Sequence, residues 1–426
     1  MVQAEAISMP AQASRQKLRG HRPGRLARQG SLHVLITLTA AFACWSIWDD
    51  ETAQAGDVST AFVATHLMKQ LAICAVALVG GLAIYSAGGP ETPAILMIYF
   101  GAQTGMNLYM KNVLSKIEVD KEEGWKGIPM GFLLTGIQQF VAFMTFACFL
   151  LASRLTSSPY QAARLKGNDR VYVLAFSLAF ALNIGLNNFS ISLVAISINM
   201  IIRSCLPVAT AATQSILSEI MGTDKMKVSL RQWVLMIGGV TCAGIATWAK
   251  SHSKSEESAN LMLGIGVTVL SIFAGALNMV LAGVMGTSLK LNPLDTTYHM
   301  ALPAGIALLV PSILISHPVS QWPGQENMTD WEVLKQLLDR NPYVLLHVFT
   351  SGVLSLIYNS LQYTMVHKLS ATHATFAGNF NKAATIALSL FLGLEALPSG
   401  LYGKIFVLAI LGNITAFTAF SASKAK

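Results

Sequence analysis

The chain has 426 residues, of which 53% are hydrophobic and only 12% are charged, and its formal net charge is +8. Soluble domains usually carry about 25% charged residues, so this composition excludes an ordinary soluble protein. A basic cluster, "RQKLRGHRPGRLARQG", directly precedes the first apolar block. That placement is typical of a cytosolic flank or a targeting peptide, and it does not indicate a nucleic-acid partner.

Apolar segments recur along the chain at about the 20-residue length that a membrane-spanning helix needs. We predict twelve spans, at residues 31–48, 66–86, 93–112, 130–152, 171–186, 190–219, 232–249, 260–286, 293–316, 342–366, 373–394 and 401–421. The sequence therefore predicts an all-α polytopic membrane protein embedded in a lipid bilayer. The first span is short and is followed by "DDETAQAG", so a signal anchor or a cleaved signal is the alternative there.

The spans also give the expected organisation of the chain. Residues 1–30 form a basic cytosolic or targeting N-terminus, 31–92 hold up to two extra spans, and 422–426 are a C-terminal tail. The remaining ten spans divide into 93–250 and 251–421, with five in each half. An odd number of spans gives the halves opposite orientations, as in transporters built from inverted repeats. The excess of Lys and Arg in alternate loops predicts that both termini face the cytosol.

In each half, the fourth span holds a strong cation within its apolar stretch: Arg203 in "SINMIIRSCLPV" and Lys382 in "GNFNKAATIAL". An unpaired cation at the membrane centre costs about 2.5–3.5 kcal/mol or more. Apart from Asp295 and Glu219 at span ends, no acidic residue lies within a predicted span, so the substrate is the expected counter-ion. A guanidinium fork and an ammonium group both suit phosphate oxygens. The alternative for Lys382 is a structural cation bonded to carbonyl groups at a helix end.

Polar side chains at helical spacing accompany both cations. The second-half stripe is Thr375, Asn379, Lys382, Thr385 and Ser389, and the first-half stripe is Ser192, Asn199, Arg203, Thr210 and Gln214. Residues three or four apart share one face of a helix, so we expect both stripes to face a water-filled cavity. Pro207 has no N–H to give the carbonyl of Arg203, which predicts a bend there. The candidate substrate-binding residues are Asn199, Arg203, Tyr298, Tyr358, Asn359, Gly378, Asn379, Asn381 and Lys382.

Catalytic motifs are absent from the sequence, which has no nucleophile elbow, no HExxH and no phosphate-binding loop. This argues against an enzyme and against an ATP-driven pump. The cysteines lie in apolar segments without metal-ligand spacing, so we expect no metal and no other cofactor. The largest predicted loop, before residue 342, has an amphipathic stretch that lies either on the membrane surface or in an ordinary ordered loop. Its apolar residues are Trp331, Leu334, Leu337 and Leu338.

Three stretches resemble the nucleotide-sugar and triose-phosphate transporter families of the drug/metabolite transporter superfamily: "YFGAQTGMNLYMKNVLS", "LNNFSISLVAISINMIIRSCLPV" and "IYNSLQYTMVHKLSATHATFAGNFNK". GDP-mannose transporters typically have Gly-Ala-Leu-Asn-Lys where this chain has "GNFNK", ending at Lys382. Plastid phosphate translocators typically have a Tyr-Asn pair, matched by Tyr358 and Asn359, and a Lys-Arg pair, of which the arginine is Ala383 here. GDP-mannose transporters usually have an aromatic–Tyr–Asn–Asn motif in the seventh span. At that place this chain has "TTYHMALP", with His299 and Met300 instead of the two amides.

The resemblance implies a secondary antiporter of phosphorylated sugars. The first function that it implies is exchange of a nucleotide sugar for a nucleoside monophosphate across a Golgi or ER membrane. The alternatives are a sugar-phosphate/phosphate antiporter of a plastid envelope, and a membrane scaffold that keeps the fold without transport. The sequence leaves open which sugar and base are carried and whether the chain forms a homodimer.

Overall fold

A computed structural model describes residues 75–89, 91–157, 159–220, 229–252, 260–369 and 397–424, and single positions between them at 371, 374, 375, 378, 381, 382, 386 and 390. The span predicted at 31–48 lies outside the described residues. Of the span predicted at 66–86, residues 75–86 are described, and of the span predicted at 373–394 only isolated positions are.

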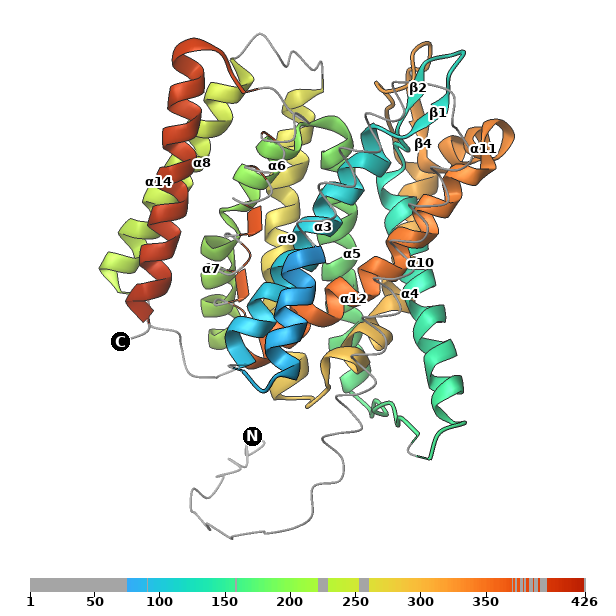
Figure 1. Ribbon diagram of the computed structural model, residues 1–426, viewed down its shortest axis with the longest axis vertical. Helices are drawn as coiled ribbons and strands as arrows, with labels where there is room; N and C mark the ends of the chain where they lie inside the picture. Colours follow the sequence, from blue (N-terminus) through green and yellow to red (C-terminus); the bar gives the residue numbers. More distant parts are fainter. Residues whose placement is uncertain are drawn as a thin grey trace, which may run out of the picture.

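The described residues form mainly helices (Figure 1). They begin with the helix Ala75–Ser86. The helices that follow are α3 (Glu91–Ser115), α4 (Gly131–Ser153), α5 (Asp169–Leu193), α6 (Ile196–Arg203), α7 (Leu206–Ile220), α8 (Leu230–Ser251), α9 (Leu261–Thr287), α10 (Pro293–Leu314), α11 (Asp330–Arg340), the 3-10 turn η1 (Pro342–Val344), α12 (Leu345–Leu369) and α14 (Gly400–Lys424). Four short strands are also present: β1 (Glu118–Asp120), β2 (Trp125–Lys126), β3 (Ser316–Pro318) and β4 (Asn327–Thr329).

Seven helices of the described part are long and apolar enough to cross a membrane: Gly131–Ser153, Asp169–Leu193, Ile196–Ile220, Leu230–Lys250, Leu261–Thr287, Pro293–Leu314 and Pro342–Lys368. Their outer faces carry exposed leucines at helical spacing, as Leu174, Leu178 and Leu182 do on α5. Lipid contact accounts for such faces, since water would disfavour them. The chain is therefore a multi-pass helical membrane protein, while the ten-helix arrangement of two inverted repeats stays a prediction.

The helices pack mainly in pairs: α5 lies against α9, α4 against α10, and α8 against α14. Figure 1 shows α8 and α14 side by side along one flank of the bundle, and the strands and α11 together at one end. The largest cluster of buried apolar side chains lies where α3, α5, α9, α10 and α12 meet.

The boundary predicted between residues 186 and 190 is wrong. Helix α5 continues to Leu193, and the chain turns at Val194 and Ala195 before α6 begins. Residues 187–189, which the two predicted spans leave between them, are buried among other helices. The Nζ of Lys111 donates to the carbonyl oxygens of Ile191 and Val194, 3.2 Å from each. Side chains from outside the helix thus satisfy carbonyls that the end of α5 leaves unpaired.

The loops of the described part also contain two short antiparallel hairpins that the sequence analysis did not predict, in which β1 pairs with β2 and β3 with β4. The rings of Trp125 and Trp322 stack 4.6 Å apart between the two loops. Arg340 donates to Asp120 at 3.0 Å and lies over the Trp125 ring. Strands this short gain their stability from such contacts between the loops, which a local sequence pattern does not contain.

The amphipathic stretch predicted in the large loop is helix α11. A capping box of Thr329 and Glu332 starts it, and the hydrogen bonds from the Thr329 backbone and hydroxyl lower the pKa of the Glu332 carboxyl. Val333 and Leu337 are fully buried against the protein, while Leu338 is half exposed. The helix therefore packs on the loop layer with one apolar face and leaves a second apolar face open.

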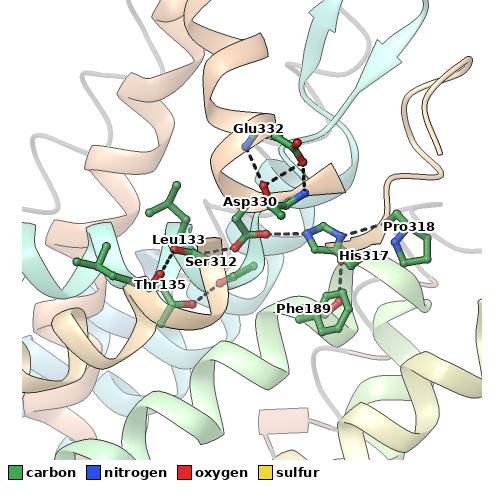
Figure 2. A network of polar contacts seen from close by, with 12 residues as sticks. Leu133, Thr135, Phe189, Ser312, His317, Pro318, Asp330 and Glu332 are labelled. Atoms are coloured by element: carbon green, nitrogen blue, oxygen red, sulfur yellow. Dashed lines mark hydrogen bonds and ion pairs between the residues drawn. The ribbon is translucent and has the colours of Figure 1, made fainter. Parts of the chain in front are cut away.

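A buried histidine–carboxylate pair joins this loop layer to the helices (Figure 2). His317 Nε2 lies 2.7 Å from Asp330 Oδ1, and both side chains are almost fully buried. The second oxygen of Asp330 accepts the backbone N–H of Leu133 at 2.7 Å, in the first turn of α4. The His317 ring also contacts Phe189 on α5. Asp330 thus satisfies an N-terminal amide of α4 for which Met130, the residue preceding the helix, offers no side-chain acceptor.

We expect Asp330→Ala to lower the thermal stability of the purified protein strongly. It leaves the N–H of Leu133 and the ring of His317 buried without this partner, at a cost of about 1–3 kcal/mol for each group. The measurement is the unfolding temperature in detergent. Asp339→Ala, at an exposed position of the same helix, is the matched control and should leave that temperature nearly unchanged. Equal shifts in the two variants would contradict the assigned role of Asp330.

Candidate functional site

A polar cavity lies between the helices, with walls from α3, α4, α5, α6, the start of α7, α9, α12 and the described positions Ala374, Thr375, Gly378 and Lys382. Its polar lining residues are Tyr99, Gln103, Asn107, Gln138, Asn183, Asn187, Asn188, Arg203, Ser355, Tyr358, Asn359, Gln362, Thr375 and Lys382. None of the described lining residues is acidic, while Arg203 and Lys382 are basic. Its volume is about 70 Å³, which leaves room for a few water molecules.

Arg203 is the last residue of α6 and points into this cavity with a half-buried side chain. Its Nη1 donates to Ser271 Oγ at 3.0 Å, and its Nη2 donates to Asn183 Oδ1 at 3.1 Å. Both acceptors are neutral. These two bonds fix the guanidinium with two of its five N–H donors and leave its charge uncompensated by a carboxylate among the described residues.

Lys382 lies against the same helix end. Its Nζ donates to the carbonyl oxygen of Arg203 at 2.7 Å, and the side chain is 5% exposed. Pro207 has no N–H for that carbonyl, so Lys382 supplies the donor that the helix lacks. The sequence predicts a bend near Arg203, and the helix is interrupted there, since α6 ends at Arg203 and α7 begins at Leu206. The contact is the helix-end bond of the structural alternative, and it also places both cations in one cavity wall.

Two tyrosines and two amides connect α3, α12 and Asn381 beside the cavity. The rings of Tyr99 and Tyr358 stack with centroids 6.2 Å apart. Gln103 Nε2 lies 3.5 Å from the Tyr358 hydroxyl, and Gln103 Oε1 accepts from Asn381 Nδ2. Asn381 is not part of the described lining and bonds Gln103 from beside it, so its direct contact with a substrate stays a prediction.

The sequence reasoning missed Tyr99 and Gln103 as site residues. A signal for them was present, because Tyr99, Gln103, Asn107 and Lys111 are spaced four apart and share one face of α3. Tyr99, Gln103 and Asn107 line the cavity, while Lys111 bonds the end of α5.

The structure distributes the other predicted site residues as follows. Tyr358, Asn359 and Gly378 line the cavity. A Cβ added at Gly378 would come no closer than 3.9 Å to Gln103 and Tyr99, so this glycine leaves open space beside the lining. Asn379 lies outside the described residues.

Asn199 and Tyr298 do not line the cavity. Asn199 is fully buried and donates to Ser190 Oγ at 3.1 Å. Tyr298 stacks on Phe143 with centroids 5.1 Å apart, in a cluster of aromatic rings near the start of α10. Ser192 of the predicted first-half stripe belongs to α5, so that stripe is interrupted at the turn before α6. Helical spacing predicts which residues share one face of a helix. It does not predict which residues contact that face, because this depends on how the other helices pack.

Comparison with known proteins gives one informative match. Over 218 residues, which are 51% of this chain and 57% of the relative, the chain is 23% identical to UDP-galactose transporter 1 of Arabidopsis thaliana. The match thus spans little more than half the length of that relative. No family model matches the chain. A solved structure described as "Crystal structure of protein" aligns with 77% of this chain and 96% of its own, at 12% identity and a TM-score of 0.43, a likeness that carries no argument. The chain is therefore similar, over about half its length, to a transporter of a nucleotide sugar.

Two glycines of α9 provide a test of the Arg203 environment. A Cβ at Gly275 would lie 2.7 Å from Asn183 Oδ1, the acceptor of Arg203, whereas a Cβ at Gly266 would meet nothing within 4 Å. We expect Gly275→Ala to lower the unfolding temperature, because overpacking costs about 1–3 kcal/mol. Gly266→Ala should keep or raise it, since alanine favours a helix over glycine by up to about 1 kcal/mol. Similar unfolding temperatures for both variants would contradict the described packing.

Proposed function

We propose that the chain transports a nucleotide sugar across an endomembrane in exchange for a nucleoside monophosphate, as a member of the nucleotide-sugar transporters of the drug/metabolite transporter superfamily. One observation carries this proposal: a cavity inside a membrane protein has Arg203 and Lys382 in one wall, with amides and tyrosines around them. The similarity to a UDP-galactose transporter supports the same substrate class.

The charge of the cavity favours an anionic cargo. Arg203 and Lys382 are joined by a backbone contact of 2.7 Å, and no described lining residue offers a negative charge. Buried charges in a membrane are stabilised by a partner of opposite sign. A phosphate or diphosphate group bound between the guanidinium and the ammonium supplies that partner, with the planar fork of Arg203 suited to two of its oxygens.

The uncharged part of the lining suits the rest of a nucleotide sugar. Amides such as Asn107, Gln138 and Asn359 offer both donors and acceptors to hydroxyl groups and to the edge of a base. The stacked rings of Tyr99 and Tyr358 offer an aromatic face and hydroxyl groups. A proton-coupled symporter would favour carboxylates in such a place, and the described lining contains none.

The cavity has to open for this function. Ligand pockets for molecules of nucleotide size measure about 300–1,000 Å³, far above the 70 Å³ found here. The lining comes from both predicted halves, with α3 to α6 from 93–250 and α9 and α12 from 251–421. Rocking one half against the other would expose the cavity to each side in turn. We propose a Golgi or ER membrane as its location, and the excess of Lys and Arg in alternate loops supports an orientation with both termini in the cytosol.

The transport proposal is tested in liposomes that contain the purified full chain and are preloaded with UMP, GMP, CMP or inorganic phosphate. Uptake of labelled UDP-galactose, other nucleotide sugars and triose phosphate is measured. We expect uptake of a nucleotide sugar that depends on an internal nucleoside monophosphate. Exchange only of triose phosphate for phosphate would replace this proposal by the plastid-type antiporter, and no exchange with any pair would favour a non-transporting scaffold.

The role of the two cations is tested in the same assay. Arg203→Gln and Lys382→Gln each remove one charge, and we expect each to weaken substrate affinity by about 10- to 100-fold, the equivalent of about 1.5–3 kcal/mol for a charged hydrogen bond. Lys404→Gln, at an exposed position near the start of α14, is the control and should leave affinity unchanged. Lys382→Gln with normal affinity and a lowered unfolding temperature would show that Lys382 serves only the end of α6.

A further inference from the structure

One amide in the cavity wall differs from its neighbours. Asn187 lies in α5, is 8% exposed and lines the cavity. Its Oδ1 is buried and has no hydrogen-bond partner among the described residues. Buried polar atoms are nearly always paired, and an unpaired one costs free energy. The other buried side-chain atoms without a partner in the described part, such as Gln139 Oε1 and Asn199 Oδ1, belong to residues outside the lining.

The amides beside Asn187 are occupied. Asn183 Oδ1 accepts from Arg203 at 3.1 Å, and Asn188 Nδ2 donates to Thr135 Oγ1 at 2.7 Å. Across the cavity, Gln362 Nε2 lies 3.1 Å from the sulfur of Met279. These contacts hold the helices together. Asn187 makes no such contact within the described residues, so the protein leaves the acceptor capacity of its Oδ1 unused at the cavity wall.

The position of Asn187 on α5 indicates which group of a substrate it can contact. Asn183 and Asn187 are one helical turn apart, which is a rise of about 6 Å. Asn183 fixes the guanidinium of Arg203, so a phosphate bound to Arg203 lies near Asn183. A cargo that extends from there along α5 brings its next group to Asn187. In a nucleotide or a sugar phosphate, that next group is a sugar ring with hydroxyl groups.

We propose that Asn187 is a specificity-determining residue, whose amide binds a hydroxyl group of the sugar ring attached to the phosphate. This inference rests on the proposed transport function and names one contact within it. A hydroxyl both donates and accepts, so it pairs with the amide in either orientation. The ribose of the nucleotide and the hexose of the nucleotide sugar offer the same chemistry, and deoxy analogues distinguish them.

The test compares parent and deoxy competitors in the liposome exchange assay, with the monophosphate that exchanges best. Inhibition by that compound is measured against its 2′-deoxy and 3′-deoxy forms, and inhibition by the nucleotide sugar against a form whose hexose lacks the 2-hydroxyl. We expect the wild type to bind one deoxy form about tenfold more weakly than its parent, the effect of one neutral hydrogen bond. The deoxy form that loses affinity identifies ribose or hexose.

Asn187→Leu keeps the size of the side chain and removes its hydrogen bonds. We expect this variant to bind parent and deoxy forms equally, at about one tenth of the wild-type affinity for the parent. Gln362→Leu, the matched change at a lining amide with a protein partner, should keep the wild-type ratio between parent and deoxy forms. The comparison is a double-mutant cycle with one change in the protein and one in the ligand.

Thermal unfolding of the ligand-free protein provides a second readout. Asn187→Leu should keep or raise the unfolding temperature, because it replaces a buried unpaired oxygen by an apolar group of similar size. A clear fall would show that the amide holds the helices together, and would overturn the inference. So would a wild type that binds every deoxy form as well as its parent, or an Asn187→Leu variant with the wild-type ratio. If the wild type exchanges no nucleotide, the proposed function fails and this inference fails with it.

Discussion

The hydrogen bond from Lys382 to the carbonyl of Arg203 is the contact on which the site depends. Pro207 has no N–H to donate to that carbonyl, and the helix is interrupted between α6 and α7. A distant segment restores the missing bond at 2.7 Å and places an ammonium group beside the guanidinium. One contact therefore completes a broken helix and brings the two intramembrane cations together. A helix end is a favourable place for a cation, because its free carbonyls carry partial negative charge.

Helix α5 contributes several residues to the cavity wall, and contacts along one side and at its C-terminal end fix its position. Along one side, Asn183 fixes Arg203, and Asn188 bonds Thr135 of α4. At its end, Lys111 bonds two of its last carbonyls, and the buried pair of His317 and Asp330 packs against it through Phe189. The loop layer at this end of the bundle is thus part of the support of the cavity, since it fixes both α5 and the first turn of α4.

The sequence predicted a multi-pass helical membrane protein and the two cations within its spans. It predicted poorly which residues contact each other across the helices. Span lengths and the break at Pro207 follow from local hydropathy and backbone chemistry, which is why they could be read directly. The continuation of α5 through its amides could not, because burial by other helices overrides the polar appearance of "LNNFS". Tyr298 and Asn199 were predicted to line the cavity on residue type and spacing, yet each packs against residues of another element. Gln103 and Tyr99 had the required spacing and were missed.

The amides of the cavity fall into two groups that residue type alone does not separate. Those with protein partners, such as Asn183 and Asn188, lower the energy of the closed bundle. Their hydrogen bonds, and the stabilisation these give, are lost when the helices separate. Asn187, which lacks a partner in the described part of the chain, raises the energy of the closed and empty bundle. Under the proposed function, a bound cargo removes this cost and compensates both cations. A form widened around the cargo is then stabilised relative to the empty closed form, which is the energetic difference that a ligand needs in order to shift a conformational equilibrium.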